Sequence, residues 1–376
     1  MAGIYLHIPF CKRRCAYCDF FSSTDTEMKD DYVDALCSEL SLRSEYLNGE
    51  TIETIYFGGG TPSQLPLSQL LRLCEHIYKV YAISSDAEVT LEANPDDLTQ
   101  DYVAALSSSL PVNRISMGVQ SFDDARLAFL NRRHTSKQAI DAVWRCREFG
   151  IENLSIDLMY GLPNQTLKDW AEDVDRAITL DVPHISAYHL TYEKGTVLWQ
   201  RLRRKEISEV NEEISEAMYV RLVELLKNAG YVHYEISNFA RPGMESRHNS
   251  SYWRAVPYLG CGAAAHSFDG SSRRWNVASI AQYIDGATKC NISHEEERLD
   301  ADTAYNDYMV TAMRTSWGAS LDYVRKHFGR TIEEYCLRMA FKHIERGSLR
   351  LENDNLQLTE KGIFISDGII SDLLKV

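Results

Sequence analysis

Near its start the chain reads Gly3-Ile4-Tyr5-Leu6-His7-Ile8-Pro9-Phe10-Cys11-Lys12-Arg13-Arg14-Cys15-Ala16-Tyr17-Cys18. Residues 3–8 form a short apolar run that ends at a proline, which predicts a buried β-strand. Directly after that strand come three cysteines in C-x3-C-x2-C spacing. Reactive residues just beyond a strand end are typical of a site at one edge of a parallel sheet, so we expect more such strands beside this one.

Short strand-like runs alternate with amphipathic helical stretches through the first two thirds of the chain. The predicted strands cover residues 3–8, 51–57, 88–92, 114–118, 153–158, 184–190 and 232–236. The predicted helices cover residues 32–47, 69–81, 137–149 and 167–179, and the last has Trp170, Val174 and Ile178 in one core-facing stripe. This alternation predicts βα units whose parallel sheet is covered by helices on its outer face.

Polar or glycine-rich residues follow four more of the predicted strands. These stretches are Gly58-Gly59-Gly60-Thr61-Pro62, Glu92-Ala93-Asn94-Pro95, Gly118-Val119-Gln120-Ser121 and Asp157-Leu158-Met159-Tyr160-Gly161-Leu162-Pro163. Turns also attract glycine, proline and asparagine, but Glu92, Gln120 and Asp157 each stand at an otherwise apolar strand end. Barrels of the (β/α) type carry their sites on this rim. The predicted class is α/β, with a partial or incomplete (β/α) TIM-type barrel over residues 1–235.

The C-terminal segment, residues 299–376, has a different pattern. Helices are predicted over residues 303–315, 321–328 and 332–346. Apolar residues alternate on both sides of the turn Asn353-Asp354-Asn355, which predicts a hairpin. Three helices and a hairpin predict a winged-helix-like α+β domain. Such modules often bind DNA, but no basic stripe is present here, so we interpret this one as a lid or docking domain.

Length and composition limit the number of domains and the kinds of partner that we expect. A length of 376 residues predicts two or three domains at roughly 150 residues each. Asp and Glu number 54 against 40 Lys and Arg, and the formal net charge of −14 disfavours nucleic-acid binding. The basic run 201–205 adjoins the acidic run 206–216 and is interpreted as a solvated helix face. Neither a membrane helix nor a signal peptide is indicated, so we expect a cytoplasmic protein.

The three clustered cysteines suit a metal ion or an iron–sulfur cluster. A structural zinc ion takes four ligands, usually as two separated pairs, whereas here no second C-x2-C exists and His7 is the only nearby donor. Three thiolates on a [4Fe–4S] cluster leave one iron open to an exchangeable ligand. Lys12, Arg13 and Arg14 lie between the first two cysteines, and we expect their charges to lower the thiol pKa values.

The run Cys11-Lys12-Arg13-Arg14-Cys15-Ala16-Tyr17-Cys18 resembles the C-x3-C-x-aromatic-C signature of the radical S-adenosylmethionine superfamily. The strand and loop sequences at residues 5–11, 58–62, 118–122 and 157–163 resemble the anaerobic coproporphyrinogen III oxidase family, and the likeness runs over essentially the whole chain. The oxidases proper resemble C-x3-C-x2-C-x-C, whereas Phe20 stands at the position of the fourth cysteine. The oxidases also carry an extension before the first strand.

The segment Arg247-His248-Asn249-Ser250-Ser251-Tyr252-Trp253 contains H-N-x-x-Y-W, which is similar to the haem-binding motif of the HemW subfamily. Proteins of that subfamily look like haem chaperones that hold haem, pass it to acceptor proteins and lack oxidase activity. The resemblance implies a radical S-adenosylmethionine barrel over residues 1–235, a haem-motif segment packing on it over 236–298, and the C-terminal domain from 299. The alternative is an oxygen-independent coproporphyrinogen III oxidase that uses a 5′-deoxyadenosyl radical, so enzymatic activity stays open.

The resemblance also implies cofactor ligands. Cys11, Cys15 and Cys18 would hold a [4Fe–4S] cluster, with S-adenosylmethionine as an exchangeable ligand on the open iron. Glycines allow close backbone approach to a ligand, and an arginine can pair with its carboxylate. The family positions that contact S-adenosylmethionine fall on Tyr5, Tyr17, Gly59, Gly60, Thr61, Glu92, Gln120, Arg132, Asp157, Thr191 and His266.

For haem, the resemblance implies His248 as the axial ligand, since neutral imidazole is a common one. Asn249 completes the motif with Tyr252 and Trp253, whose rings would pack on the macrocycle. Cys261 and His266 are rival iron ligands. The alternative to a haem role is that His248 and Asn249 cap a loop and that the two aromatic residues belong to the core.

Overall fold

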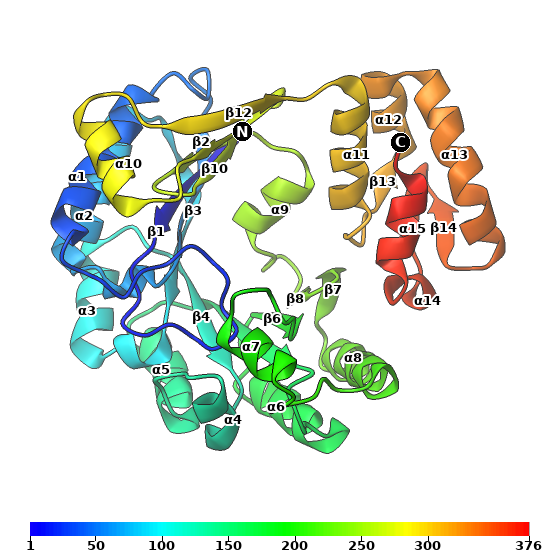
Figure 1. The fold of residues 1–376 in the computed structure, drawn as a ribbon, viewed down its shortest axis with the longest axis horizontal. Coiled ribbons are helices and arrows are strands. Elements are labelled where there is room, and N and C mark those ends of the chain that lie inside the picture. Colours follow the sequence, from blue (N-terminus) through cyan, green and yellow to red (C-terminus); the bar gives the residue numbers. More distant parts are fainter. Residues whose placement is uncertain (376) are drawn as a thin grey trace.

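The structure is a computed structural model that describes residues 1–375 (Figure 1). Its main sheet is 12-stranded, in the order β12-β11-β10-β9-β1-β2-β3-β4-β5-β6-β8-β7. Its centre consists of parallel strands in chain order: β1 (Ala2–Ile8), β2 (Ile52–Gly59), β3 (Ile83–Ala93), β4 (Arg114–Gln120), β5 (Asn153–Tyr160) and β6 (His184–His189). Each overlaps a strand predicted from the sequence, so the predicted α/β class is confirmed.

Helices cover the outer face of this parallel sheet (Figure 1). They are α1 (Lys29–Leu42), α2 (Leu67–Val80), α3 (Gln100–Ser109), α4 (Asp124–Phe129), α5 (Ser136–Glu148) and α6 (Leu167–Thr179). The stripe predicted for α6 is confirmed, because Trp170 and Val174 are fully buried and Trp170 Nε1 donates to Met218 O of α8 (Glu212–Asn228) at 2.9 Å. Across residues 1–375 we find no helix with the length and apolar character of a membrane span.

The sheet does not close on itself. Beyond β6 it continues with antiparallel β8 (Asn238–Ala240) and β7 (Val232–Glu235), and only Ile236 and Ser237 separate these two strands. The strand predicted at residues 232–236 is thus present as part of a hairpin, not as a further parallel strand. Beyond β1 the sheet continues with parallel β9 (Tyr258–Cys261) and then with antiparallel β10 (His266–Phe268), β11 (Ser272–Asn276) and β12 (His294–Arg298). The predicted partial barrel is confirmed.

Residues 236–298 contribute strands to both ends of the sheet, and they also supply two helices that pack beside it. Helix α9 (Arg247–Trp253) lies against the inner face of β2 and β3. Helix α10 (Ile280–Thr288) packs beside α1 on the outer layer. Strand β12 forms one edge of the sheet, and all of its residues are exposed. A short helix, α7 (Val197–Arg203), precedes this part of the chain.

The C-terminal domain has its own hydrophobic core around Tyr305, Met309 and Leu356. It contains α11 (Ala301–Ala312), α12 (Leu321–Phe328), α13 (Arg330–Glu345), α14 (Glu360–Ile363) and α15 (Ser366–Leu373). A small antiparallel sheet has the order β13-β15-β14, from Ala319–Ser320, Asn355–Leu358 and Leu349–Glu352. The predicted hairpin and winged-helix-like fold are confirmed, and α12 has the predicted bounds.

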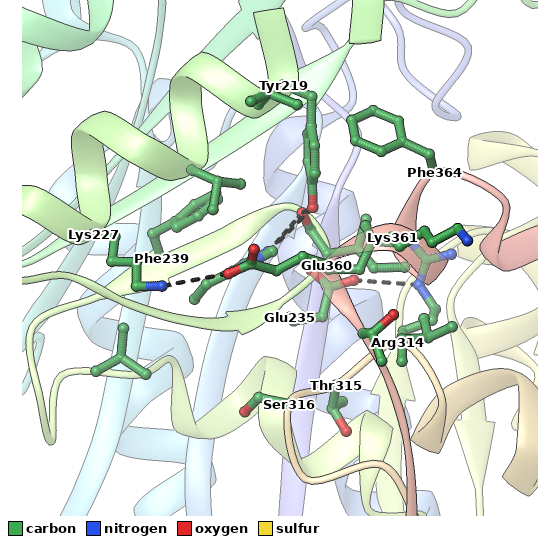
Figure 2. Close-up of a pocket in the computed structure, with 18 of the residues that line it drawn as sticks. Tyr219, Lys227, Glu235, Phe239, Arg314, Thr315, Ser316, Glu360, Lys361 and Phe364 are labelled. Atoms are coloured by element: carbon green, nitrogen blue, oxygen red, sulfur yellow. Dashed lines mark hydrogen bonds and ion pairs between the residues drawn. The ribbon is translucent and has the colours of Figure 1, made fainter. Parts of the chain in front are cut away.

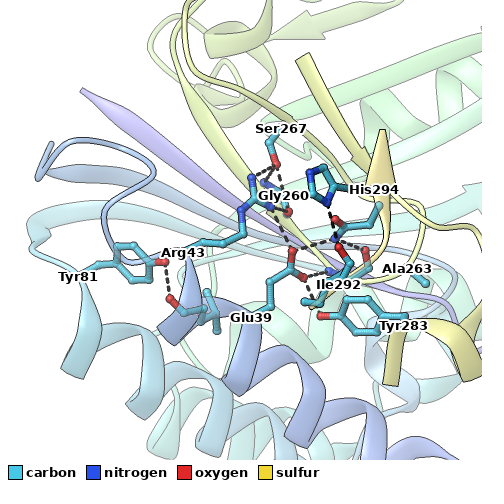
Figure 3. A network of polar contacts seen from close by, with 12 residues as sticks. Glu39, Arg43, Tyr81, Gly260, Ala263, Ser267, Tyr283, Ile292 and His294 are labelled. Atoms are coloured by element: carbon cyan, nitrogen blue, oxygen red, sulfur yellow. Dashed lines mark hydrogen bonds and ion pairs between the residues drawn. The ribbon is translucent and has the colours of Figure 1, made fainter. Parts of the chain in front are cut away.

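A buried carboxylate ties the outer helices to strands β9–β11 (Figure 3). Glu39 of α1 is 0% exposed, and Arg43 Nη1 donates to it at 3.1 Å. It also accepts hydrogen bonds from Tyr283 OH at 2.7 Å, Asn276 Nδ2 at 2.8 Å and Gly262 N at 2.9 Å. Because these donors come from distant segments, Glu39 holds one end of the sheet to α1 and α10.

Candidate functional site

The three clustered cysteines lie in the loop between β1 and α1. Backbone hydrogen bonds from Cys11 N to Ser23 O (2.8 Å) and from Ala16 N to Leu130 O (3.0 Å) fix this loop. All three thiols are free of disulfides; Cys11 is buried and the other two are half-buried. Thr61 Oγ1 donates to Cys11 Sγ at 3.5 Å, and Arg132 Nη1 donates to Cys15 Sγ at 3.2 Å. The structure thus brings Thr61 of the predicted rim, and Arg132 from the turn after α4, to the thiols.

The described residues contain no preformed site for a single metal ion. Among residues 1–375, no three His, Cys, Asp or Glu side chains converge as the ligands of one ion do. The three thiols are nevertheless close enough to interact: the charge of Cys15 raises the pKa of Cys11, and the charges of Cys15 and Cys11 raise that of Cys18.

Burial raises the pKa values of two of the three clustered thiols. It raises the pKa of Cys11, and it raises that of Cys18 to about 11, although Arg132 and Arg14 respectively act in the opposite direction. The charge of Arg14 lowers the pKa of Cys18, as expected of an adjacent basic residue, but burial outweighs it and the net shift is upward. The side chains at residues 12–14 are exposed, so water screens their charges. Thiolates at Cys11 and Cys18 would therefore need a further stabilising partner, which a metal ligand position supplies.

Two carboxyl groups with raised pKa values lie on β3 and β5. Glu92 is the penultimate residue of β3, as expected, but β5 continues to Tyr160, so the expected position of Asp157 at the strand end is wrong. Glu92 accepts hydrogen bonds from Tyr56 OH at 2.8 Å and from Gly59 N at 3.1 Å. Desolvation raises the pKa of Glu92 to about 7 and that of Asp157 to about 6, and the charge of Asp157 adds to the shift of Glu92. Buried carboxyl groups that titrate near neutrality are candidates for binding a polar ligand.

Gln120 ends β4 in a strained backbone conformation. Its φ is +70°, in the left-handed region, where non-glycine residues are rare. The buried carboxylate of Asp173 on α6 holds the next two residues: Ser121 Oγ and Phe122 N each donate to it at 2.7 Å. Such strain is sustained by surrounding contacts and occurs often at ligand sites.

Arg132 connects the rim residues to the cysteine loop. Besides Cys15, its guanidinium donates through Nη2 to Asn94 Oδ1 at 2.6 Å and to the carbonyl oxygen of Gly118. Its Nε is buried and has no hydrogen-bond partner among residues 1–375. An unpaired buried donor of this kind is costly unless a ligand satisfies it, so it marks a place for an acceptor group.

His7 and Tyr56 are side chains at the site to which the sequence interpretation gave no role in binding S-adenosylmethionine. His7 Nε2 lies 2.9 Å from Phe21 O and its Nδ1 lies 3.1 Å from Tyr5 OH, so both nitrogens are occupied. Its ring packs beneath Gly59, where φ is +109° and an added Cβ would lie 2.7 Å from the imidazole. Tyr56 is two residues from Gly58 on β2, and His7 is two residues from Tyr5 on β1, so each faces the same side of the sheet as a predicted site residue. This alternation along the strands could have identified both.

The remaining positions carried over for S-adenosylmethionine are more scattered. Tyr17 lies close to Arg132 and Cys15, and burial raises its pKa. Thr191 is exposed just beyond β6. His266 is exposed on β10, where it stacks on Trp275 with ring centroids 5.8 Å apart, and it lines a cavity of about 320 Å³. These three are not linked to one another by any contact among the described residues.

His248 is enclosed within the barrel. It is 2% exposed, its Nδ1 lies 2.8 Å from Thr54 Oγ1 and its Nε2 lies 2.8 Å from Tyr252 OH. Its ring stacks on Tyr56, with centroids 4.9 Å apart, and burial lowers its pKa to about 3. In this conformation His248 has no free ring nitrogen to offer an iron atom, which fits the alternative of a core histidine.

The rest of the H-N-x-x-Y-W motif also has local partners. Ser246 caps the start of α9, where its Oγ accepts a hydrogen bond from Asn249 N at 3.3 Å. Tyr252 packs edge-to-face on Tyr258. The guanidinium of Arg314 lies 6.0 Å from the centre of the Trp253 ring, so this end of α9 faces the C-terminal domain. Cys261, a rival iron ligand, is fully buried in β9.

We expect His248→Ala to lower the free energy of unfolding by about 2–4 kcal/mol. The substitution opens a cavity beside Tyr56 and leaves Thr54 and Tyr252 without hydrogen-bond partners. Urea unfolding followed by circular dichroism measures the change, with the exposed His294→Ala of β12 as a control expected within about 0.5 kcal/mol of the original protein. Equal stabilities of the two variants would contradict a structural role for His248.

Comparison with known proteins gives consistent matches. Residues 5–177 match the family described as the radical SAM superfamily, and residues 299–365 match the HemN C-terminal domain. The Bacillus subtilis protein named heme chaperone HemW is 33% identical over 377 residues, covering 100% of this chain and 99% of that protein. Its Lactococcus lactis namesake is 35% identical over 372 residues, covering 98% and 96%. The solved Escherichia coli coproporphyrinogen III oxidase HemN, 22% identical, superimposes with a TM-score of 0.86 over 100% of this chain and 90% of that one, a likeness of fold.

Proposed function

The chain belongs to the HemW family of the radical S-adenosylmethionine superfamily, and from this we propose that it binds haem and transfers it to acceptor proteins. The observation that carries the proposal is similarity along the full length to proteins named heme chaperones. Phe20 also supports the proposal. It stands where the oxidases are expected to have a fourth cysteine, and its side chain is 66% exposed.

In this proposal Cys11, Cys15 and Cys18 hold a [4Fe–4S] cluster, which supplies one-electron chemistry when bound. The chain tunes that site through hydrogen bonds to the ligand sulfurs. Thr61 donates to Cys11 Sγ, and Arg132 donates to Cys15 Sγ with a positive charge. Such donors stabilise negative charge on sulfur and raise a cluster's reduction potential.

S-adenosylmethionine is the exchangeable ligand of the proposed site, and the chain's polar groups fit its methionine end. The unpaired Nε of Arg132 is a donor for the carboxylate. Glu92, when ionised, is an acceptor for the amino group, and Tyr56 and Gly59 hold it in place. The glycine loop allows close approach, since Gly60 packs against the backbone of Pro9 with no room for a Cβ.

The affinity for S-adenosylmethionine is expected to fall as the pH drops below 7. Glu92 has a raised pKa of about 7. Once protonated, its carboxyl group is neutral, and only one of its oxygens can still accept a hydrogen bond from the cationic amino group. Between pH 8 and pH 6 we expect the affinity of the reconstituted protein to fall roughly tenfold, since one proton must be released on binding. Equilibrium dialysis measures it. Glu92→Gln should flatten the profile; an unchanged slope would remove Glu92 from the binding site.

Haem titration of the anaerobically reconstituted protein tests the proposed function. We expect saturable binding, followed by transfer of haem to a haem-free acceptor protein, and no conversion of coproporphyrinogen III. The absence of haem binding would refute the proposal. Sustained turnover of coproporphyrinogen III would replace it with the oxidase function.

A further inference from the structure

The charged side chains that line the cavity between the two domains have partners of their own (Figure 2). Figure 2 shows Arg314 joined to Glu235 at 3.3 Å and Lys227 joined to Glu360 at 3.4 Å. The other charged residues of the lining also have polar partners among residues 1–375. This cavity of about 1070 Å³ therefore presents no unsatisfied charge to select a ligand, whereas the interior of the barrel contains one.

Arg114 of β4 is a buried cation with two unsatisfied nitrogens. Its side chain is only 1% exposed. Nε and Nη1 of its guanidinium have no hydrogen-bond partner among residues 1–375. Arginine side chains keep their charge in proteins, and a buried charge is costly unless an acceptor group satisfies it. Arg114 therefore marks a place for a negatively charged group.

Two further unsatisfied side chains adjoin Arg114 on the same face of the sheet. Arg114 is in register with Thr90 of β3 on one side and with Asn153 of β5 on the other. The buried Thr90 Oγ1 and Asn153 Oδ1 also lack hydrogen-bond partners among the described residues. The next residues along, Ile115 and Leu154, belong to the core beneath the outer helices, so this set of three faces the barrel interior.

The polar groups around Arg114 are occupied by other partners. Glu92 accepts hydrogen bonds from Tyr56 OH and from a backbone N–H, one on each oxygen. Both ring nitrogens of His184 and both of His248 lie within 2.8 Å of hydroxyl groups. The charge of Arg114 acts on all four of these side chains, so its guanidinium lies among them. Its neighbours therefore do not supply the acceptor that it lacks.

We propose that the barrel interior contains a binding site for a small hydroxycarboxylate, with Arg114 as its anchor. A carboxylate only accepts hydrogen bonds, and it forms charge-assisted ones with a guanidinium. Thr90 Oγ1 can donate to the same carboxylate. Asn153 Oδ1 is an acceptor, so a hydroxyl group beside the carboxylate satisfies it. The inference goes beyond the proposed function, in which the carboxylate of S-adenosylmethionine is assigned to Arg132.

Substitution of Arg114 tests the site, with glycolate as the probe. Sodium glycolate should raise the thermal unfolding midpoint of the full-length reconstituted protein more than sodium chloride does at equal ionic strength, because it binds the folded state. Arg114→Gln should remove this gain and weaken glycolate binding, measured by calorimetry, roughly tenfold or more. Arg43→Gln is the matched control. Arg43 is also buried but is paired with Glu39, so this variant should be less stable and yet keep the gain.

The hydroxyl group of the ligand is tested separately. Acetate, which lacks it, should bind about fivefold more weakly than glycolate, and Asn153→Ala should remove the difference. Equal affinities in the original protein would show that the site takes carboxylates without regard to a hydroxyl group, which contradicts the proposed class.

Glycolate binding should tighten as the pH falls from 8 to 6. Glu92 and Asp157 have raised pKa values of about 7 and about 6, and their ionised forms repel a carboxylate at Arg114. Glu88, on the same face of β3, is held by backbone N–H groups of α9. The remaining titratable groups near Arg114 stay neutral in this range: Tyr56, Tyr234, His184 and His248. This direction is opposite to the one expected for S-adenosylmethionine.

Three results would overturn the assignment. They are a gain from glycolate no larger than that from chloride, glycolate binding that persists in Arg114→Gln, and competition by saturating S-adenosylmethionine, which would place glycolate at Arg132. Because the assay requires neither haem nor an acceptor protein, its failure leaves the haem-carrier function standing. A protein that binds glycolate but no haem would retain the barrel site and lose the carrier function.

Discussion

Replacing Cys15 with serine is expected to abolish the iron–sulfur absorbance of the protein. Cys15 is the middle member of the cysteine loop, and its sulfur accepts a hydrogen bond from Arg132 at 3.2 Å. A serine hydroxyl is a poor ligand for iron, and two thiolates in one loop cannot hold a cube of four irons. After anaerobic reconstitution, iron analysis should give about four atoms per chain for the original protein and close to none for the variant.

The fold should survive this substitution. Loop contacts at Cys11 N and Ala16 N use backbone atoms that serine leaves in place. Cys290→Ser is the matched control, because Cys290 is an exposed cysteine outside the cluster, and it should retain the full iron content. Four irons in Cys15→Ser, or zinc in place of iron in the original protein, would contradict the proposed ligand set.

The largest loss of stability is expected for Glu39→Ala. The substitution removes a buried carboxylate that receives four hydrogen bonds and leaves Arg43, which is 8% exposed, without its charged partner. Breaking a buried ion pair in this way costs about 3–5 kcal/mol. Urea unfolding should show a lower midpoint, with early loss of structure at strands β9–β11, which hydrogen exchange can locate.

Glu75→Ala is the control for this prediction. Glu75 is an exposed residue of the neighbouring helix α2, and its removal should change stability by less than about 0.5 kcal/mol. A loss at Glu39 no larger than the loss at Glu75 would show that the network in Figure 3 does not hold α1 to the sheet.

Regular elements with a strong pattern could be predicted from the sequence. The stripe of Trp170, Val174 and Ile178 placed α6 with its observed bounds, because all three side chains face the core. Strands β10 and β12 were missed for a physical reason. β10 has three residues, and β12 reads His-Glu-Glu-Glu-Arg, so neither has the apolar run by which a buried strand is recognised.

At the site, too, the features that could be predicted are those with a local sequence pattern. The cysteine spacing indicates a cluster because the ligands are neighbours in the chain, and the family likeness identifies Arg132 and Glu92. Neither the spacing nor the likeness could reveal that His248 contacts Thr54, 194 residues away, or that burial outweighs the charge of Arg132 at Cys11. Both depend on which segments surround a side chain after folding, and local sequence carries little information about that.

Strand β12 has a consequence for how copies of this chain meet. An edge strand offers unpaired backbone groups on which another molecule can add a strand. Glu295, Glu296 and Glu297 stand in succession along this edge and are all exposed. A second copy pairing with this edge would bring three negative charges against three. Electrostatic repulsion therefore disfavours the addition of a strand from another copy at β12.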